Sequence, residues 1–93
     1  MQAYYDPKKV TLTMNNDEAL VLGEMLQRIL ENSEADLIKF LESSAEFAVL
    51  VRINNNLEKV LPQHFAENYD AQVAHARVAI IKESGRFEGI AES

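Results

Sequence analysis

The chain has 93 residues, 47% of them hydrophobic and 26% charged, which is typical of a globular protein with one domain. It contains no cysteine, which excludes disulfides, cysteine-ligated zinc and thiol catalysis. No apolar run approaches the roughly 18 residues of a transmembrane helix, and the first residues lack the pattern of a signal peptide. We therefore expect a single cytoplasmic domain over residues 1–93 that does not bind membranes.

The net charge of −6 comes from residues 17–46, which hold eight acidic residues against Arg28 and Lys39. This balance argues against nucleic-acid binding, which needs a basic surface. A charged helix face is most often only solvated, and the alternative is a surface for a basic protein partner. The candidate acidic partner face consists of Asp17, Glu24, Glu31, Glu34 and Asp36.

Residues 8–14 alternate apolar and polar side chains, which predicts a short β-strand. A single strand leaves its backbone groups unpaired, so it needs a partner. The candidates are residues 2–6, the tail at 86–91, and the same strand of a second subunit. In an alternative interpretation, the two ends of the chain, residues 1–7 and 86–93, are flexible.

Asn15 followed by Glu18 is a capping-box pattern, and it predicts a helix over residues 15–32. Apolar residues at helical spacing define its expected buried face. These are Ala19, Leu22, Met25, Leu26, Ile29 and Leu30.

Three residues of this helix need a separate explanation. Leu20 and Val21 fall on or beside its polar face, where they either cover the preceding strand or contact another molecule. Gly23 costs about 1 kcal/mol relative to alanine inside a helix. Either another element packs closely at this glycine, or the cost is simply tolerated.

The rest of the chain predicts three further helices. A short helix follows Ser33, and Ser43 with Glu46 forms a second capping box that starts a helix ending before Pro62. A rival interpretation makes 47–53 a buried strand and 54–56 a turn. Asn68 and Gly85 mark the start and end of the last helix. The predicted fold is mainly α, a compact bundle of about four helices with a short N-terminal strand.

Two of these helices are apolar on more than one side. Residues 69–83 carry one stripe with Tyr69, Val73, Ala76 and Ile80, and a second with Ala74, Val78 and Ile81. A domain of this size has one core and normally uses one stripe per helix. The second stripe therefore predicts a homo-oligomer, most simply a dimer. Its expected interface consists of Ala74, Val78, Ile81, Val49 and Ile53.

No motif in the chain demands a particular chemistry. His64 and His75 match no zinc spacing, and the three glycines form no phosphate-binding loop. We expect no metal, no cofactor and no enzymatic activity. Asn54 lies within the apolar arc of its helix, and Arg77 lies beside Tyr69 on the last helix. Asn54, Tyr69 and Arg77 are therefore candidates to bind a small anion or nucleotide at a subunit interface.

Several segments resemble a group of small uncharacterised bacterial proteins. The resemblance covers residues 10–78 and is carried by Leu12-Thr13, Glu18-Ala19-Leu20-Val21-Leu22, Leu57-Glu58-Lys59-Val60-Leu61, Phe65, Asn68-Tyr69-Asp70 and Ala76-Arg77. It implies a mainly helical fold and supplies no activity. The small size and acidic half favour a regulator, inhibitor or adaptor, such as an antitoxin, immunity or phage accessory protein. The alternative is a protein that binds or sequesters a small ligand.

Overall fold

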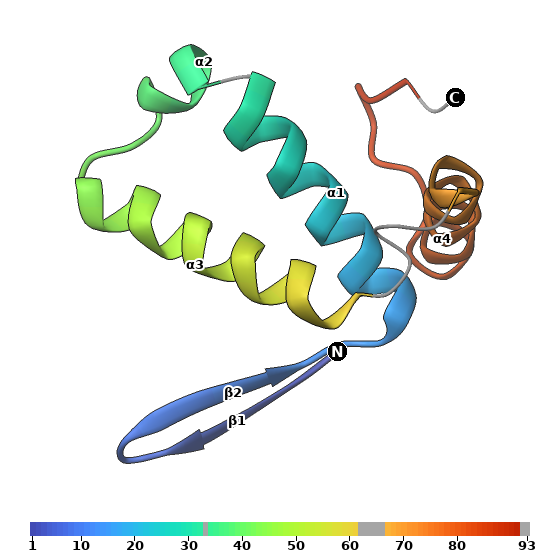
Figure 1. The fold of residues 1–93 in the computed structure, drawn as a ribbon. Coiled ribbons are helices and arrows are strands. Elements are labelled where there is room, and N and C mark those ends of the chain that lie inside the picture. The colour runs from blue at the N-terminus through green and yellow to red at the C-terminus, as the bar shows by residue number, and fades with distance from the viewer. Residues whose placement is uncertain (33, 62–66, 92–93) are drawn as a thin grey trace.

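The computed structural model describes residues 1–32, 34–61 and 67–91, which form an N-terminal hairpin followed by four helices (Figure 1). The elements are β1 (Gln2–Asp6), β2 (Lys9–Thr13), α1 (Asn16–Asn32), α2 (Glu34–Ile38), α3 (Ser44–Val60) and α4 (Tyr69–Ser84). The prediction of a mainly α fold with a short N-terminal strand is confirmed. His64, which was considered as a metal ligand, and Phe65, which belongs to the resemblance, lie outside the described residues.

The partner of the predicted strand is the segment immediately before it. β1 and β2 pair in antiparallel register, with Ala3 opposite Leu12 and Tyr5 opposite Val10. The tail at 86–91 forms no strand, so pairing with the tail is wrong. That segment instead contains a turn in which the Ile90 N–H donates to the Phe87 carbonyl at 3.3 Å.

A side chain holds the turn between the two strands. Asp6 Oδ1 accepts hydrogen bonds from the backbone N–H groups of Lys8 at 2.8 Å and Lys9 at 3.2 Å. Aspartate followed by proline is a favoured turn sequence because the carboxylate bonds to nearby N–H groups and Pro7 fixes φ. This turn signal was present in the sequence but was not used to predict the hairpin.

The predicted capping box at the start of α1 is present. The Glu18 N–H donates to Asn15 Oδ1 at 2.8 Å, and the Asn15 N–H donates to Glu18 Oε1 at 2.9 Å. The bond from Asn15, helped by the N-terminal ammonium 3.4 Å away, lowers the pKa of Glu18 against a smaller opposing effect of burial. These bonds fix the direction in which α1 leaves the hairpin.

The core lies where α1 crosses α4. Leu20 is only 2% exposed and is clustered with Val73 and Ala76, and Val21 packs beside them. The expectation that Leu20 and Val21 cover the strand or face another molecule is therefore wrong. α1 packs against α3 as well as α4, so its buried arc is wider than one apolar stripe. Met25, which was expected to be buried, is exposed.

Gly23 allows α3 to approach α1 closely. A Cβ atom at this position would lie 3.3 Å from Leu61 Cδ1 and 3.8 Å from Leu57 Cδ1. The first distance is shorter than ordinary van der Waals contact. Of the two explanations for this glycine, the structure therefore supports close packing.

Replacing Gly23 by leucine should lower the free energy of unfolding by about 1–3 kcal/mol, because the larger side chain would force α3 away from α1. Urea denaturation followed by circular dichroism measures this change. Glu31→Leu, at an exposed position of α1, is the matched control and should change stability by less than about 0.5 kcal/mol. Equal stability of the two variants would contradict tight packing at Gly23.

The ends of α3 and α4 lie where the sequence predicts them, and the one exception is the capping of α4 by Asn68. Ser43 and Glu46 form the predicted capping box, and 47–53 is helical rather than a strand. Gly85, at φ 78°, ends α4 and donates its N–H to the Ile81 carbonyl at 2.7 Å. Asn68 precedes α4 without capping it by its side chain. Its Oδ1 instead accepts from Gln72 Nε2 at 2.7 Å.

The chain is open for its mass. It exposes 7477 Å², whereas a compact monomer of this mass is expected to expose about 5,400 Å². Its radius of gyration is 14.7 Å, against an expected value of about 12.3 Å. The excess is therefore about 2,000 Å² per chain.

Candidate functional site: three exposed apolar surfaces and a basic cavity

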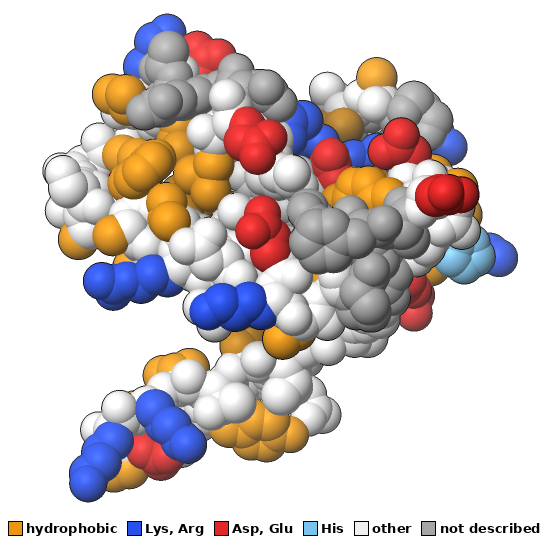
Figure 2. All heavy atoms as spheres, viewed as in Figure 1, with side chains coloured by type: hydrophobic (Ala, Val, Ile, Leu, Met, Phe, Trp, Pro, Cys, Tyr) orange, Lys and Arg blue, Asp and Glu red, His pale blue; other side chains and the backbone are white. Residues whose placement is uncertain are grey.

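The hairpin carries the first exposed apolar surface. Because partners in an antiparallel pair point to the same side, Ala3, Tyr5, Val10 and Leu12 share one side of the hairpin. We call these four residues the hairpin face. All of them are exposed, and Tyr5 and Val10 reach 81% and 70%. Figure 2 shows the hairpin standing apart from the helices, with open space between it and the body of the molecule.

The second surface lies on α3. Val49, Ile53 and Val60 are exposed along one side of this helix, and we call these three residues the α3 outer face. With Arg52, Asn56 and Leu57 they line a shallow hollow of about 420 Å³, and Leu57 lies at the edge of this face because it also approaches Gly23 of α1. Val49, Ile53 and Val60 are exposed large hydrophobic residues. Val49 and Ile53 thus remain uncovered in the single chain, as a role in an interface requires.

The third surface is the second stripe of α4. Ala74 and Val78 are exposed, and Ile81 is partly buried. The opposite stripe behaves as predicted, since Val73 and Ala76 are buried against α1. The two stripes of α4 therefore have different environments, one in the core and one at the surface.

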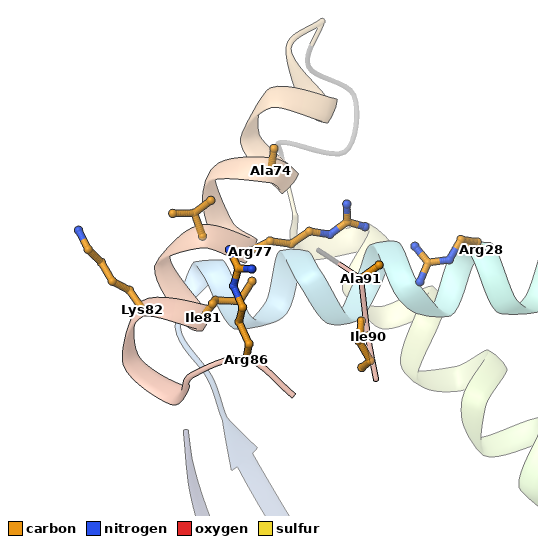
Figure 3. Close-up of a pocket in the computed structure, with 9 residues that line it drawn as sticks. Arg28, Ala74, Arg77, Ile81, Lys82, Arg86, Ile90 and Ala91 are labelled. Atoms are coloured by element: carbon orange, nitrogen blue, oxygen red, sulfur yellow. The ribbon is translucent and has the colours of Figure 1, made fainter. Parts of the chain in front are cut away.

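A cavity of about 570 Å³ begins at this third surface and extends to the tail. Its apolar lining comes from Ala74, Val78 and Ile81 of α4 and from Ile90 and Ala91 of the tail. Figure 3 shows Arg77 of α4 and Arg28 of α1 extending toward each other beside this lining.

The charged residues that line the cavity are all basic. They are Arg28, Arg77, Lys82 and Arg86, and among the described residues no acidic side chain contributes to the lining. This concentration of positive charge stands in contrast to the net charge of −6 for the chain. The sequence could not predict it, because Arg28 comes from a different helix and lies within the acidic segment.

One carboxylate partly neutralises this basic group. Glu24 Oε2 accepts from Arg28 Nη1 at 2.8 Å and from Arg77 Nη2 at 3.4 Å. The first pair joins residues four positions apart within α1, and the second joins α1 to α4. Because the Glu24 side chain is 26% exposed, solvent screens both interactions. Glu24 thus holds two guanidinium groups close together.

The three residues predicted to bind a ligand do not converge. Tyr69 packs against the core, and burial, together with the charge of Glu24, raises its pKa. Arg77 also lies beside Glu24. Asn54 belongs instead to α3, which packs on the other side of α1 (Figure 1).

Asn54 lies within the apolar arc of α3, as the sequence predicts. It follows the same side of α3 as Leu57 and Leu61, the residues that approach Gly23. Its Oδ1 atom is buried and has no hydrogen-bond partner among the described residues. Asn54 and Arg77 therefore belong to different helices, α3 and α4, and lie apart within one chain.

The candidate acidic partner face does not form one free surface. Glu24 is engaged by two arginines, and Asp36 pairs at 3.7 Å with the lysine three residues later. Asp17 is partly buried in the first turn of α1, Glu31 is exposed near its end, and Glu34 begins α2. Glu24 and Asp36 are therefore each paired with a basic side chain of the same chain.

Two kinds of site were also sought in the part of the chain that the structure describes. Its helices include none with the length and apolar character needed to cross a membrane. No three histidine or acidic side chains gather there in a way that could hold a metal ion. His75, the described histidine, is exposed on α4 and lines a separate hollow with Asn16 and Asp17.

Comparisons with protein-family models, with curated proteins and with solved structures found no match to this chain. The resemblance to small bacterial proteins therefore stays a prediction.

Proposed function

We propose that this chain is a non-enzymatic interaction protein that acts as a homo-oligomer, most simply a dimer. A regulator, inhibitor or adaptor, of the antitoxin, immunity or phage accessory type, is the functional class that suits such a protein. The observation that carries the proposal is the excess exposed surface of about 2,000 Å² per chain. Obligate dimers bury about 1,000–2,500 Å² on each subunit, so one interface between copies would account for the whole excess.

The position of the exposed residues supports the same proposal. The hairpin face, the α3 outer face and the second stripe of α4 are all apolar, and extended apolar surfaces of this kind mark association sites. They include all five residues expected at the interface, Ala74, Val78, Ile81, Val49 and Ile53. Association with a second copy also covers these surfaces without requiring a different partner molecule.

Sedimentation velocity over a wide concentration range tests the proposal. We expect a particle with a mass of at least twice 10.5 kDa, and a dissociation to single chains only at low concentration. A single species of 10.5 kDa at every concentration would overturn the proposal. In that case the apolar surfaces would need a cover other than a second copy.

A second candidate function is the binding of a small anion or nucleotide at the basic cavity. Arg28, Arg77, Lys82 and Arg86 supply several donors beside an apolar lining, which suits a ligand with an anionic group and an apolar part. The cavity includes Arg77 from the predicted set. Tyr69 and Asn54 are not among its lining residues.

Glu24→Gln should strengthen this binding, because the carboxylate that neutralises Arg28 and Arg77 would be lost while the size of the side chain is kept. We expect affinity for inorganic phosphate or ATP to rise about three- to tenfold, which corresponds to about 1 kcal/mol. Isothermal titration calorimetry measures the change. Arg86→Gln, which removes a lining cation, should lower the affinity by a similar factor. The absence of heat with all three proteins would dismiss the second function.

A further inference from the structure

No described residue outside the hairpin covers it. Every residue of β1 and β2 is exposed, and within residues 1–32, 34–61 and 67–91 the two strands pair only with each other. A hairpin of two strands is marginal in water and becomes stable when it gains further strands or packs against a helix. Packing of the hairpin face against an apolar surface of another molecule would therefore stabilise the hairpin.

The hairpin is nevertheless built as an ordered arm. The carboxylate of Asp6 fixes the turn at the tip, and Thr13 Oγ1 donates to the Gln2 carbonyl at 3.3 Å at the base. The arm joins α1 directly through the capping box of Asn15 and Glu18. An ordered arm pays less conformational entropy on docking than a flexible segment would.

The α3 outer face has the properties that the hairpin face requires. It is apolar, and the distance from Val49 to Val60 is about 16 Å along a helix with a rise of 1.5 Å per residue. On each strand the two residues of the hairpin face lie about 7 Å apart, so the α3 outer face is long enough to receive them. The second stripe of α4 suits the hairpin less well, because basic residues surround it and the tail lies over part of it.

We infer that the hairpin face of one copy packs on the α3 outer face of a second copy, and that the second copy returns the same contact. The inference rests on the proposed homo-oligomer and names the surfaces that form it. A two-fold axis makes the contacts equivalent, so one arrangement covers two hairpin faces and two α3 outer faces. Hairpins that stacked only on each other would leave the α3 outer faces uncovered.

Cross-linking between single-cysteine variants tests this arrangement, and the native chain provides a background without cysteine. Val10→Cys and Ile53→Cys are purified separately, mixed under conditions where subunits exchange, and treated with a short bismaleimide. A link between the two variants is necessarily a link between chains. We expect the heterodimer of Val10→Cys with Ile53→Cys to be the main cross-linked product in intact-mass spectra.

Thr11→Cys is the matched control, because Thr11 neighbours Val10 in β2 but lies on the opposite side of the hairpin. Its yield with Ile53→Cys should be at least tenfold lower. Equal yields for the two pairs would overturn the inference. So would a main product that joins two Val10→Cys chains, which would show that the hairpins stack on each other.

The experiments distinguish failure of the contact between the hairpin face and the α3 outer face from failure of the proposed homo-oligomer. If the unmodified chain sediments as a single copy, both the homo-oligomer and the packing of the hairpin face on the α3 outer face are ruled out. If it sediments as a dimer without the expected heterodimeric link, only the packing of the hairpin face on the α3 outer face is ruled out. In the latter case, the second stripe of α4 becomes the surface to test.

Discussion

Replacement of Ala76 by glutamate is expected to abolish the cooperative fold. Ala76 has an exposure of 0% and lies against Leu20 and Val73, where α4 crosses α1. Glutamate would place a larger side chain and an unpaired charge in this contact. A buried charge without a partner costs several kcal/mol, and a domain of this size has a total stability of about 5–14 kcal/mol. We expect loss of the cooperative thermal transition in circular dichroism.

Ala71→Glu is the matched control for this prediction. It makes the same substitution five residues earlier on α4, at an exposed position in the first turns of the helix. A negative charge near a helix N-terminus is favourable, so stability should be unchanged or slightly raised. If Ala76→Glu retained a transition like that of Ala71→Glu, the contact between α1 and α4 would not be the core of this protein.

Replacement of Ile53 by glutamate is expected to separate the copies without unfolding them. Ile53 is 39% exposed in the single chain, so glutamate there meets solvent and should change the stability of one copy by less than about 0.5 kcal/mol. In an interface, the same carboxylate would be buried without a partner. A loss of about 2–4 kcal/mol raises the dissociation constant about 30- to 1,000-fold. Sedimentation velocity reports this shift.

Asn55→Glu separates the effect of position from the effect of added charge. Asn55 is exposed on α3 but lies away from the α3 outer face, so its variant should associate like the unmodified chain. If Ile53→Glu and Asn55→Glu associate equally well, the α3 outer face is not part of the interface. Unfolding of Ile53→Glu in circular dichroism would instead place Ile53 in the core of the single chain.

Local sequence patterns were sufficient for most of the helix boundaries. The capping boxes of Asn15 with Glu18 and Ser43 with Glu46 are both present, because each depends only on residues three positions apart. Gly85 ends α4 for a similarly local reason, since glycine adopts positive φ without a steric cost. The sequence left three possible partners for the strand at 8–14, and the structure selects residues 2–6, for which Asp6-Pro7 is a local turn signal.

Side-chain environments were predicted less well where several elements meet. Leu20 was assigned near the polar face of its helix, yet it is the most buried large side chain of the core. A helical wheel shows which residues share a side but not how many neighbours the helix will have. α1 has two, α3 and α4, so residues beyond the main apolar stripe become buried.

The sequence by itself determined the helical class, the ends of α1, α3 and α4 and the two apolar stripes of α4, because these depend on spacing within a single segment. Only the tertiary structure decided which side of α1 meets α4 and which surfaces stay uncovered. It also brought Arg28 to Arg77 around Glu24. Such contacts join residues about 50 positions apart, and their formation depends on how the helices pack rather than on any local preference.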